Sequence, residues 1–368
     1  MRARQLIHTS VTICGLCSVL LAQAISQQPD PGSLTASVPT TSIEQLRQQA
    51  ESGDATAQFS LGQAYDTGSG VTRNPDKAAT WYRKAAAQDN AKAQNSLGVM
   101  YWMGNGVDRD KEKAVEWYRK AARQLEPKAM FNLGAAYYNG EGIASDPLLA
   151  VAWFLLSAEA GDPSGLDAAK RSRDENRPWL INDACVKIGQ MYEQGADLPK
   201  NSQQAVTWYR KAADAGSGEA TIALAVMYLK GNDVAQARPW CEAAAKAKLV
   251  GGYHCLAYLY QRGAGVAQDL STAFKYYKAA AEMAHPPSMY ALGVMYENGE
   301  GTKLDRIKAF SWLIMAARRG HEDSLAEARK LRSSMTEKEW KTAQQKLPLG
   351  FSVEIVNRIL DGSFGRTR

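Results

Sequence analysis

The chain is poor in residues that bind metals or serve as activated nucleophiles. Its 368 residues include four histidines and five cysteines. Beyond residue 24 three of each remain, and they form neither His-x-x-x-His nor Cys-x-x-Cys, the spacings on which many zinc sites are built. The nearest approach to a metal cluster is His254 beside Cys255, with Cys241 upstream. It fits no zinc template, so we expect ordinary helix packing there, with no metal and no cofactor.

Neither positive nor negative charge is in large excess: the chain has 44 Lys and Arg residues and 38 Asp and Glu residues. The formal net charge is +6, which is too small and too dispersed to predict nucleic-acid binding. The densest basic cluster, Arg329-Lys330 with Arg332, fits a solvated helix face better. We therefore expect no nucleic-acid partner.

Long apolar runs are missing apart from a short one near the N-terminus. Residues Val11 to Leu21 follow Arg2 and Arg4 and precede Ala22-Gln23-Ala24, a small-x-small cleavage site. The run is too short to span a bilayer, although an uncleaved anchor is an alternative. We predict a signal peptide at residues 1–24, a periplasmic or secreted mature chain, and no stable membrane insertion after cleavage.

A repeated motif fills most of the remaining sequence. The first three copies are 36 residues apart, and each has a Leu-Gly pair, a tyrosine four residues after the leucine, a glycine loop and then an aromatic pair. The later copies drift: Ile-Gly or Leu-Ala replaces Leu-Gly, the fifth copy has a shortened loop and Trp240 alone, and the seventh has Trp312-Leu313. The seven copies are marked by Leu61, Leu97, Leu133, Ile188, Leu224, Leu256 and Leu292. A fixed period of this length predicts a solenoid.

Each copy predicts two amphipathic helices. Ala57, Leu61, Gly62 and Tyr65 lie on one stripe at helical spacing, and the stretch containing Trp81 shows the same periodicity. The glycine after the leucine predicts a close approach of two helix backbones. Trp81 and Trp117, in the middle of the second stripe, are predicted to be core residues.

The glycine loop predicts the end of the first helix. Gly68 and its counterparts suit a left-handed residue at a helix C-terminus. A Gly-x-Gly can also cradle phosphate, but the preceding strand and the longer fingerprint of such a site are absent. Asp76, Asp110 and Asp305 are expected to cap the second helix of their copies.

The pattern Ala-x-x-x-Leu-Gly-x-x-Tyr-x-x-Gly-x-Gly-Val followed by Lys-Ala-x-x-Trp-Tyr-x-x-Ala-Ala resembles the Sel1-like repeat, a relative of the tetratricopeptide repeat. The resemblance covers about residues 43 to 345, with departures at Gly195-Ala196-Asp197, after Gly231 and at 162–183. It implies an all-α fold, an α/α solenoid with a right-handed superhelix of about seven hairpins. It also implies a protein or peptide partner on the concave surface, with roles in envelope assembly, polysaccharide export, quality control or host interaction.

The expected organisation along the chain has five parts. A linker rich in Gln, Pro, Ser and Thr occupies 25–41. Repeats 1 to 3, with a half-repeat cap and an extra helix, occupy 42–180. Repeats 4 to 7, with a capping helix, occupy 181–345, and 346–368 is a tail without repeat pattern. The extra helices are expected because Leu166 and Leu325 stand 159 residues apart, as Trp153 and Trp312 do.

The cysteines left after signal cleavage are odd in number, so at least one is unpaired within a monomer. Cys241 and Cys255 fall on consecutive helices of the predicted fold. Two alternatives stay open for them, a disulfide or a pair of buried free thiols.

Some cysteine-rich members of the family bind penicillin, which makes an enzyme the alternative function. The sequence contains no Ser-x-x-Lys and no Gly-x-Ser-x-Gly, and the paired cysteines of those members do not recur. We therefore expect a non-catalytic scaffold, with a penicillin-interacting or peptidoglycan-directed hydrolase as the alternative.

The first helices offer the candidate binding face. Positions −2, +2 and +5 from the repeat leucine project away from the hairpin contact, and we expect the +5 position to be exposed. At position −2, Phe59, Phe131, Val186 and Ile222 are read instead as packing on the next repeat. The residues predicted to bind a partner are Asp66, Trp102, Tyr138, Gln190, Glu193, His254, Tyr258, Tyr290 and Glu297.

Overall fold

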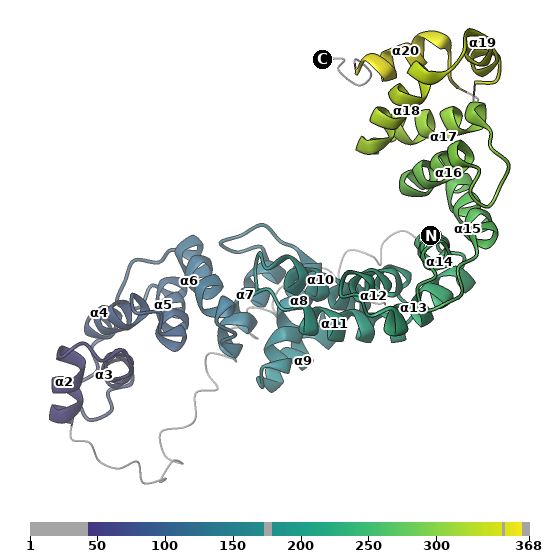
Figure 1. Cartoon of the computed structure of the whole chain (residues 1–368). Helices are drawn as coiled ribbons and strands as arrows, with labels where there is room; N and C mark the ends of the chain where they lie inside the picture. Colours follow the sequence, from purple (N-terminus) through teal and green to yellow (C-terminus); the bar gives the residue numbers. More distant parts are fainter. Residues whose placement is uncertain (1–42, 173–178, 348–349, 363–368) are drawn as a thin grey trace, which may run out of the picture. The chain divides into compact units, whose positions relative to one another are not determined.

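A computed structural model describes residues 43–172, 179–347 and 350–362 of the chain. Nineteen α-helices and no strand occur in these ranges (Figure 1). The predicted all-α class is therefore confirmed for the described part of the chain. The predicted signal peptide (1–24) and linker (25–41) lie outside the described residues. So do residues 173–178, next to the boundary predicted between repeats 3 and 4. The chain forms two compact units, Met1–Lys211 and Ala212–Arg368, each of which is treated by itself below.

In the first unit, helix hairpins follow a single capping helix. We call the first helix of each hairpin helix A and the second helix B. Helix α2 packs on α3, as the predicted half-repeat cap requires, and each later hairpin packs on the one before it. The helices are α2 (Ile43–Glu51), α3 (Ala55–Thr67), α4 (Pro75–Ala86), α5 (Ala91–Met103), α6 (Lys111–Arg123), α7 (Pro127–Asn139), α8 (Pro147–Glu159), α9 (Pro163–Arg171), α10 (Leu180–Gln194) and α11 (Ser202–Asp214), whose last turn belongs to the second unit.

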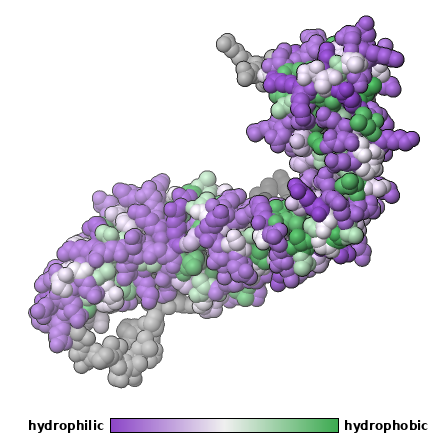
Figure 2. Space-filling view, viewed as in Figure 1, coloured by the Kyte–Doolittle hydropathy of each residue, from purple (hydrophilic) through white to green (hydrophobic). Residues whose placement is uncertain are grey.

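The second unit continues the same alternation and ends in four helices that pack together. Its helices are α12 (Gly218–Lys230), α13 (Val234–Lys246), α14 (Val250–Arg262), α15 (Leu270–Glu282), α16 (Pro286–Asn298), α17 (Arg306–Arg318), α18 (Glu322–Ser334), α19 (Glu337–Gln345) and α20 (Val353–Asp361). The surface in view is mostly hydrophilic, with hydrophobic residues emerging in local groups (Figure 2).

In repeats 1 to 4 the glycine after the repeat leucine or isoleucine makes room for an aromatic ring of helix B. A Cβ atom added to Gly98 would lie 2.6 Å from Cε1 of Tyr118 and 3.2 Å from the carbonyl oxygen of Ala114. The same relation joins Gly62 to Tyr82 and Gly189 to Tyr209. The prediction of a close approach is confirmed, but the nearest atoms belong to an aromatic ring and not to the opposite backbone.

The loop glycines serve the repeat stack. Gly104 ends α5 with a φ of 75°, the left-handed conformation expected there. Gly106 lies directly against the backbone of Pro75 and Asp76 at the start of helix B in the preceding repeat, where no side chain would fit. The Gly-x-Gly loop is therefore an inter-repeat contact.

The expected caps of helix B are correct at two positions and shifted at a third. Asp110 and Asp305 accept hydrogen bonds from the backbone N–H groups of Lys113 and Lys308, at 2.9 and 3.0 Å. In the first repeat Asn74 takes this role, while Asp76 lies in the first turn of α4. There it faces the positive end of the helix dipole without capping it.

In repeats 1 and 2 the second residue of the aromatic pair, and not the tryptophan, forms the deep core, whereas Trp153 and Trp208 of repeats 3 and 4 are themselves buried. Tyr82 and Tyr118 are buried, whereas Trp81 and Trp117 are only half-buried and pack at the edge of the core. The ammonium group of Lys120 lies 4.2 Å from the ring centroid of Trp117, and the first repeat has the equivalent pair. The prediction that Trp81 and Trp117 are central core residues is wrong, because both rings pack at the edge of the core, where one face of each ring is turned to a lysine.

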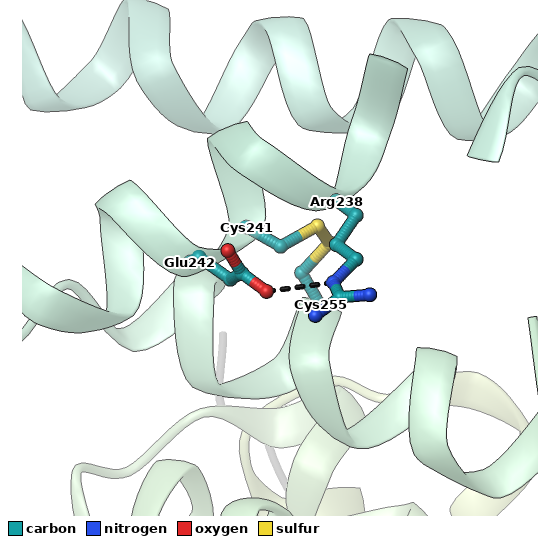
Figure 3. The surroundings of a disulfide bond; sticks show 4 residues. All are labelled: Arg238, Cys241, Glu242 and Cys255. Carbon is teal, nitrogen blue, oxygen red and sulfur yellow. Dashed lines mark hydrogen bonds and ion pairs between the residues drawn. A yellow bond between two sulfur atoms is a disulfide. The ribbon is translucent and has the colours of Figure 1, made fainter. Parts of the chain in front are cut away.

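A disulfide joins repeats 5 and 6 within the second unit. Cys241 on α13 is bonded to Cys255 on α14, with the two Cα atoms 5.5 Å apart (Figure 3). Cys241 takes the place of the buried aromatic residue of helix B, facing Ala225 in place of the glycine. Arg238 and Glu242 form a 2.7 Å ion pair beside it. Cys185 is a buried free cysteine.

Extra helices follow the third and seventh hairpins. Helix α9 packs on α8, and α18 packs on α17. The segment expected to be a tail contains α20, whose Val356 and Ile359 are buried against the end of the second unit. Its apolar residues are too few to show the repeat pattern but lie on one side of a short helix.

Candidate functional site: the outer face of the A helices

The +5 residues of several A helices are hydrogen-bonded to a tyrosine of helix B in the same repeat. The hydroxyl of Tyr209 donates to Oε2 of Glu193 at 3.0 Å, and the hydroxyl of Tyr277 donates to Oε1 of Gln261 at 2.9 Å. Asp66 and Tyr82 form the equivalent hydrogen bond in the first repeat. These +5 side chains therefore have a structural role, and all three are half-buried.

Burial raises the pKa of both members of the Asp66–Tyr82 pair. Desolvation raises the pKa of Asp66, although the nearby Arg73 opposes the effect. Desolvation and the neighbouring Asp66 likewise raise the pKa of Tyr82. The tyrosine thus stays protonated as the hydrogen-bond donor. Sequence reasoning missed this pairing, although a spacing of 16 residues between acceptor and tyrosine recurs and could have revealed it.

Trp102 is not an exposed anchor. Its side chain is only 6% exposed and lies against Tyr118, with ring centroids 6.3 Å apart. The ammonium group of Lys111 is 5.1 Å from the centroid of the Trp102 ring. The expectation of an exposed +5 residue is therefore wrong at Trp102, because the large indole fills the space between helices A and B. Tyr138, at the same position of the next repeat, is half-buried.

Side chains at the −2 position mostly pack against other helices, as expected from the sequence for Phe59, Phe131, Val186 and Ile222. Phe131 and Val186 are buried. The Phe131 ring contacts Phe154 of its own hairpin, with centroids 5.3 Å apart, whereas Ile222 contacts Gly251 of the next repeat. The neighbour therefore differs between copies, but in each case the side chain fills a helix interface.

In the second unit, His254 belongs to a small polar cluster that the sequence did not predict. Nδ1 of His254 and Nδ1 of His285 each lie 2.8 Å from Oγ of Ser288. The ring of Tyr290 stacks on His321 at 4.8 Å between centroids, and Nδ1 of His321 lies 2.9 Å from Oγ of Ser324. The motif His-x-x-Ser recurs at a spacing of 36 residues, from His285 to His321, and could have indicated the cluster.

Burial favours the neutral form of His254 and His285. Desolvation, with repulsion from His285 and His321, lowers the pKa of His254 to about 4. The pKa of His285 is lowered for the same reasons. No group of three or more His, Cys, Asp or Glu residues placed to hold a metal ion occurs in the described ranges. The His254–Ser288 contact instead joins the A helices of repeats 6 and 7, and the stack of Tyr290 on His321 joins the A helix of repeat 7 to the start of α18.

The predicted face remains open mainly in the second unit. Tyr258 is 39% exposed, and Tyr290 and Glu297 are half-buried. Burial and the nearby Glu327 raise the pKa of Glu297. In the first unit, Gln190 and Glu193 are half-buried. The structure thus brings His254, Tyr258, Tyr290 and Glu297 onto successive A helices of one unit.

A shallow pocket of about 270 Å³ lies elsewhere in the first unit, on B helices. Its lining mixes three cations, two acids and a tryptophan: Glu116, Arg119, Lys120, Arg123, Trp153 and Asp197. Arg123 donates a 2.7 Å hydrogen bond to the carbonyl oxygen of Ala196 across the pocket. The two acids offset two of the three cations, so the lining keeps a single net positive charge.

The family model of the Sel1 repeat matches seven segments of this chain, and the chain belongs to the Sel1 repeat family. The matched residues are 55–90, 91–124, 127–162, 182–217, 218–248, 253–285 and 286–321. The predicted α/α solenoid class with seven repeats is thus confirmed. Sel1 repeat proteins are generally non-catalytic, and their fold is typically used for protein–protein interaction.

Three similar proteins illustrate the range of the family. Chitin synthase regulatory factor 3 of Schizosaccharomyces pombe is 30% identical over 110 residues, which are 28% of this chain and 12% of that relative. The chain therefore spans only a small part of that regulatory factor. The solved structure of c5321, a protective antigen of uropathogenic Escherichia coli with an SLR fold, is 27% identical, with a TM-score of 0.43 over 82% of this chain and 70% of that one. A Sel1 repeat protein from Oxalobacter formigenes is 29% identical, with a TM-score of 0.38 over 78% and 79% of the two chains.

Within the described residues, no helix has both the length and the apolar character required to cross a bilayer.

Proposed function

We propose that the protein is an exported, non-catalytic scaffold that binds a protein or peptide partner through the concave face of its repeat solenoid, along the side of the A helices that points away from the hairpin contact. The partly exposed aromatic side chains on that face support this function best, above all Tyr258. Aromatic residues left partly in water on a repeat surface are favoured anchors in protein interfaces. Roles in envelope assembly, quality control or host interaction follow from the family resemblance.

Export is part of the proposal and rests on the N-terminal sequence. Protein recovered from the cell envelope should begin near Ile25. Intact residues 1 to 24 on that protein would contradict export. The alternative, a penicillin-interacting hydrolase, is tested separately by incubating the mature protein with labelled penicillin, where covalent labelling would favour the enzyme.

The main experiment is crosslinking in living cells followed by mass spectrometry of the captured proteins. The double substitution Tyr258→Ala with Tyr290→Ala should weaken capture at least tenfold while helical content is retained, because two anchors on one face are removed. The pair Trp81→Ala with Trp117→Ala, on the B helices, is the matched control and should leave capture intact if the variant stays folded. Equal capture by the wild type and the A-helix variant would place binding on another face.

A further inference from the structure

The glycine loop of repeat 4 departs from the loops of the repeats before it. In repeats 2 and 3 the second loop glycine, Gly106 or Gly142, lies directly against the backbone at the start of helix B in the preceding repeat, a contact that leaves no room for a side chain. Asp197 takes this place in repeat 4. The repeat-4 loop reaches the last residue of α6, two repeats back, where Arg123 donates its 2.7 Å hydrogen bond to the carbonyl oxygen of Ala196.

The pocket of about 270 Å³ is lined by this loop and by the B helices α6 and α8. Trp153 of α8 is 3% exposed and forms its buried, apolar part, while Asp197 supplies an acid from the loop. Since pockets for drug-sized ligands start at about 300 Å³, this one suits a smaller molecule.

One stripe of α6 supplies the other four lining residues. They stand at i, i+3, i+4 and i+7, positions that share a helix face, and all four are exposed: Glu116, Arg119, Lys120 and Arg123. The same stripe holds Thr80, Arg83, Lys84 and Ala87 on α4, and Ala152, Leu155, Leu156 and Glu159 on α8. The combination of three cations with an acid therefore sets α6 apart from both neighbouring B helices.

The charged groups of this pocket keep hydrogen-bonding capacity for a ligand. Arg119 donates one of its N–H groups to the hydroxyl of Tyr137 at 3.1 Å, and Arg123 donates one to the repeat-4 loop. Each guanidinium group has further donors. Within the ranges that the structure describes, neither Glu116 nor Asp197 forms an ion pair with any of the three cations. The opposite charges of the lining thus face the pocket without being paired to one another.

This charge pattern determines the kind of ligand. Guanidinium groups bind carboxylates strongly, because their planar N–H groups match two carboxylate oxygens. The two acids in turn attract a positive group. With three cations against two acids, the complement is a molecule that carries two carboxylates and one ammonium group. A neutral hydroxyl would also hydrogen-bond to the acids, but only a positive group offsets their charge.

We propose that this pocket binds an acidic amino acid, with its carboxylates on Arg119 and Arg123 and its ammonium group held by Glu116 and Asp197. Lys120 adds the third positive charge. The site goes beyond the scaffold function and does not depend on it, because it lies on B helices of the first unit, whereas the proposed partner face lies on the A helices.

Isothermal titration calorimetry of the full mature chain at low ionic strength tests the site with defined probes. These are glutamate, in each enantiomer; glutarate, which lacks the ammonium group; and 2-hydroxyglutarate, which has a hydroxyl group in its place. We expect one molecule of glutamate per chain for at least one enantiomer, and at least fivefold weaker binding of the other two compounds. Equal binding of glutamate and either of them overturns the proposal, as does no binding or binding of several molecules per chain.

A pair of matched variants assigns the binding to this pocket. Arg119→Ala with Lys120→Ala should weaken glutamate at least tenfold. Arg83→Ala with Lys84→Ala removes the same two side chains from α4 and should stay within twofold of the wild type. Equal weakening by both variants would show that net charge and not the pocket governs binding, which overturns the proposal.

The substitution Glu116→Gln separates the acids from the cations. It should weaken glutamate, whose ammonium group loses a partner, and tighten glutarate, whose carboxylates no longer face this acid. The preference for glutamate over glutarate should therefore fall below twofold. A preference that stays at the wild-type value shows that the acids do not select the ligand and overturns the proposal, even if the arginine and lysine variants behave as expected.

Discussion

The hydroxyl of Tyr209 donates a 3.0 Å hydrogen bond to Oε2 of Glu193, joining helix B of repeat 4 to the outer face of its helix A. Tyr209 is buried and Glu193 is half-buried, so the bond lies where water competes weakly. Tyr209→Phe should lower the free energy of unfolding by about 1 to 2 kcal/mol, because a charged acceptor loses a donor. Urea denaturation measures the change.

A double-mutant cycle with Glu193→Met isolates this interaction. The coupling between the two sites should be about 0.5 to 1.5 kcal/mol. In repeat 3, Phe154 and Tyr138 hold the same two positions, so Phe154→Tyr serves as a control that creates no acid–phenol pair. A coupling below about 0.3 kcal/mol would show that the hydrogen bond is energetically silent.

Gly98 should tolerate no added methyl group while Tyr118 is present. The Cβ atom would lie 2.6 Å from the ring, so we expect Gly98→Ala to cost about 1 to 3 kcal/mol through overpacking. In a Tyr118→Ala background the cost should fall, because the ring is gone and the remaining close contact is the carbonyl oxygen of Ala114 at 3.2 Å. Thermal melts of the four proteins check this, and a cost that is unchanged without the ring would contradict the steric account.

Tyr118 should matter more for stability than its neighbour Trp117. Tyr118→Ala removes a buried ring and is expected to cost about 3 to 5 kcal/mol. Trp117→Ala removes a half-buried ring at the edge of the core and should cost less than about 2 kcal/mol. Urea unfolding of both variants ranks them. The reverse order would restore the tryptophans as the main core residues.

Acid should weaken the second unit through His254. Its pKa is about 4 in the folded protein, against 6.5 for the free side chain, so the unfolded chain binds more protons between these pH values. The resulting stability is fully present above pH 6.5 and falls as the pH drops toward 4. Between pH 7 and pH 5 the loss from His254 alone should be about 2 kcal/mol.

His254→Phe tests this assignment, because Phe59 and Phe131 occupy the same position in other repeats. Urea midpoints of the variant should depend less on pH between 7 and 5 than those of the wild type. His285 contributes in the same direction, so a residual slope is expected. Parallel pH profiles for the two proteins would assign the acid sensitivity to other groups.

The repeat period predicts the hairpins because its glycines and aromatics are spaced by contacts within one repeat. Gly104 and Asp110 could be placed correctly from such local spacing. The outer face was harder to predict. Helix periodicity predicts which residues point away from one neighbouring helix. In the repeat stack, however, a helix A contacts its own helix B, helix B of the preceding repeat and the neighbouring A helices, so residues that point away from one helix are buried by another.

Trp102 and His254 show what that projection leaves out. The length of the Trp102 side chain lets it reach back to Tyr118 from a position that points away from the hairpin contact. His254 is held by Ser288 of the next repeat, a contact that depends on how closely two A helices approach. How far a side chain extends and how closely two helices approach are properties of the packed structure. Helix periodicity alone could therefore identify which face of the A helices is available, but not which residues on that face are exposed.

The disulfide between Cys241 and Cys255 should stabilise the second unit by holding repeat 5 to repeat 6. The cysteines are 14 residues apart, and the chain-entropy model gives about 3 kcal/mol for a loop of this size. Reduction, or the double substitution Cys241→Ala with Cys255→Ala, should lower the free energy of unfolding by about that amount.

Alkylation of the denatured mature chain, followed by mass spectrometry, should modify one thiol, Cys185, before reduction and all three cysteines after it. Cys185→Ala is the control and should leave the response to reduction unchanged. Three modified thiols without reductant would show that Cys241 and Cys255 are buried free thiols in the protein from cells.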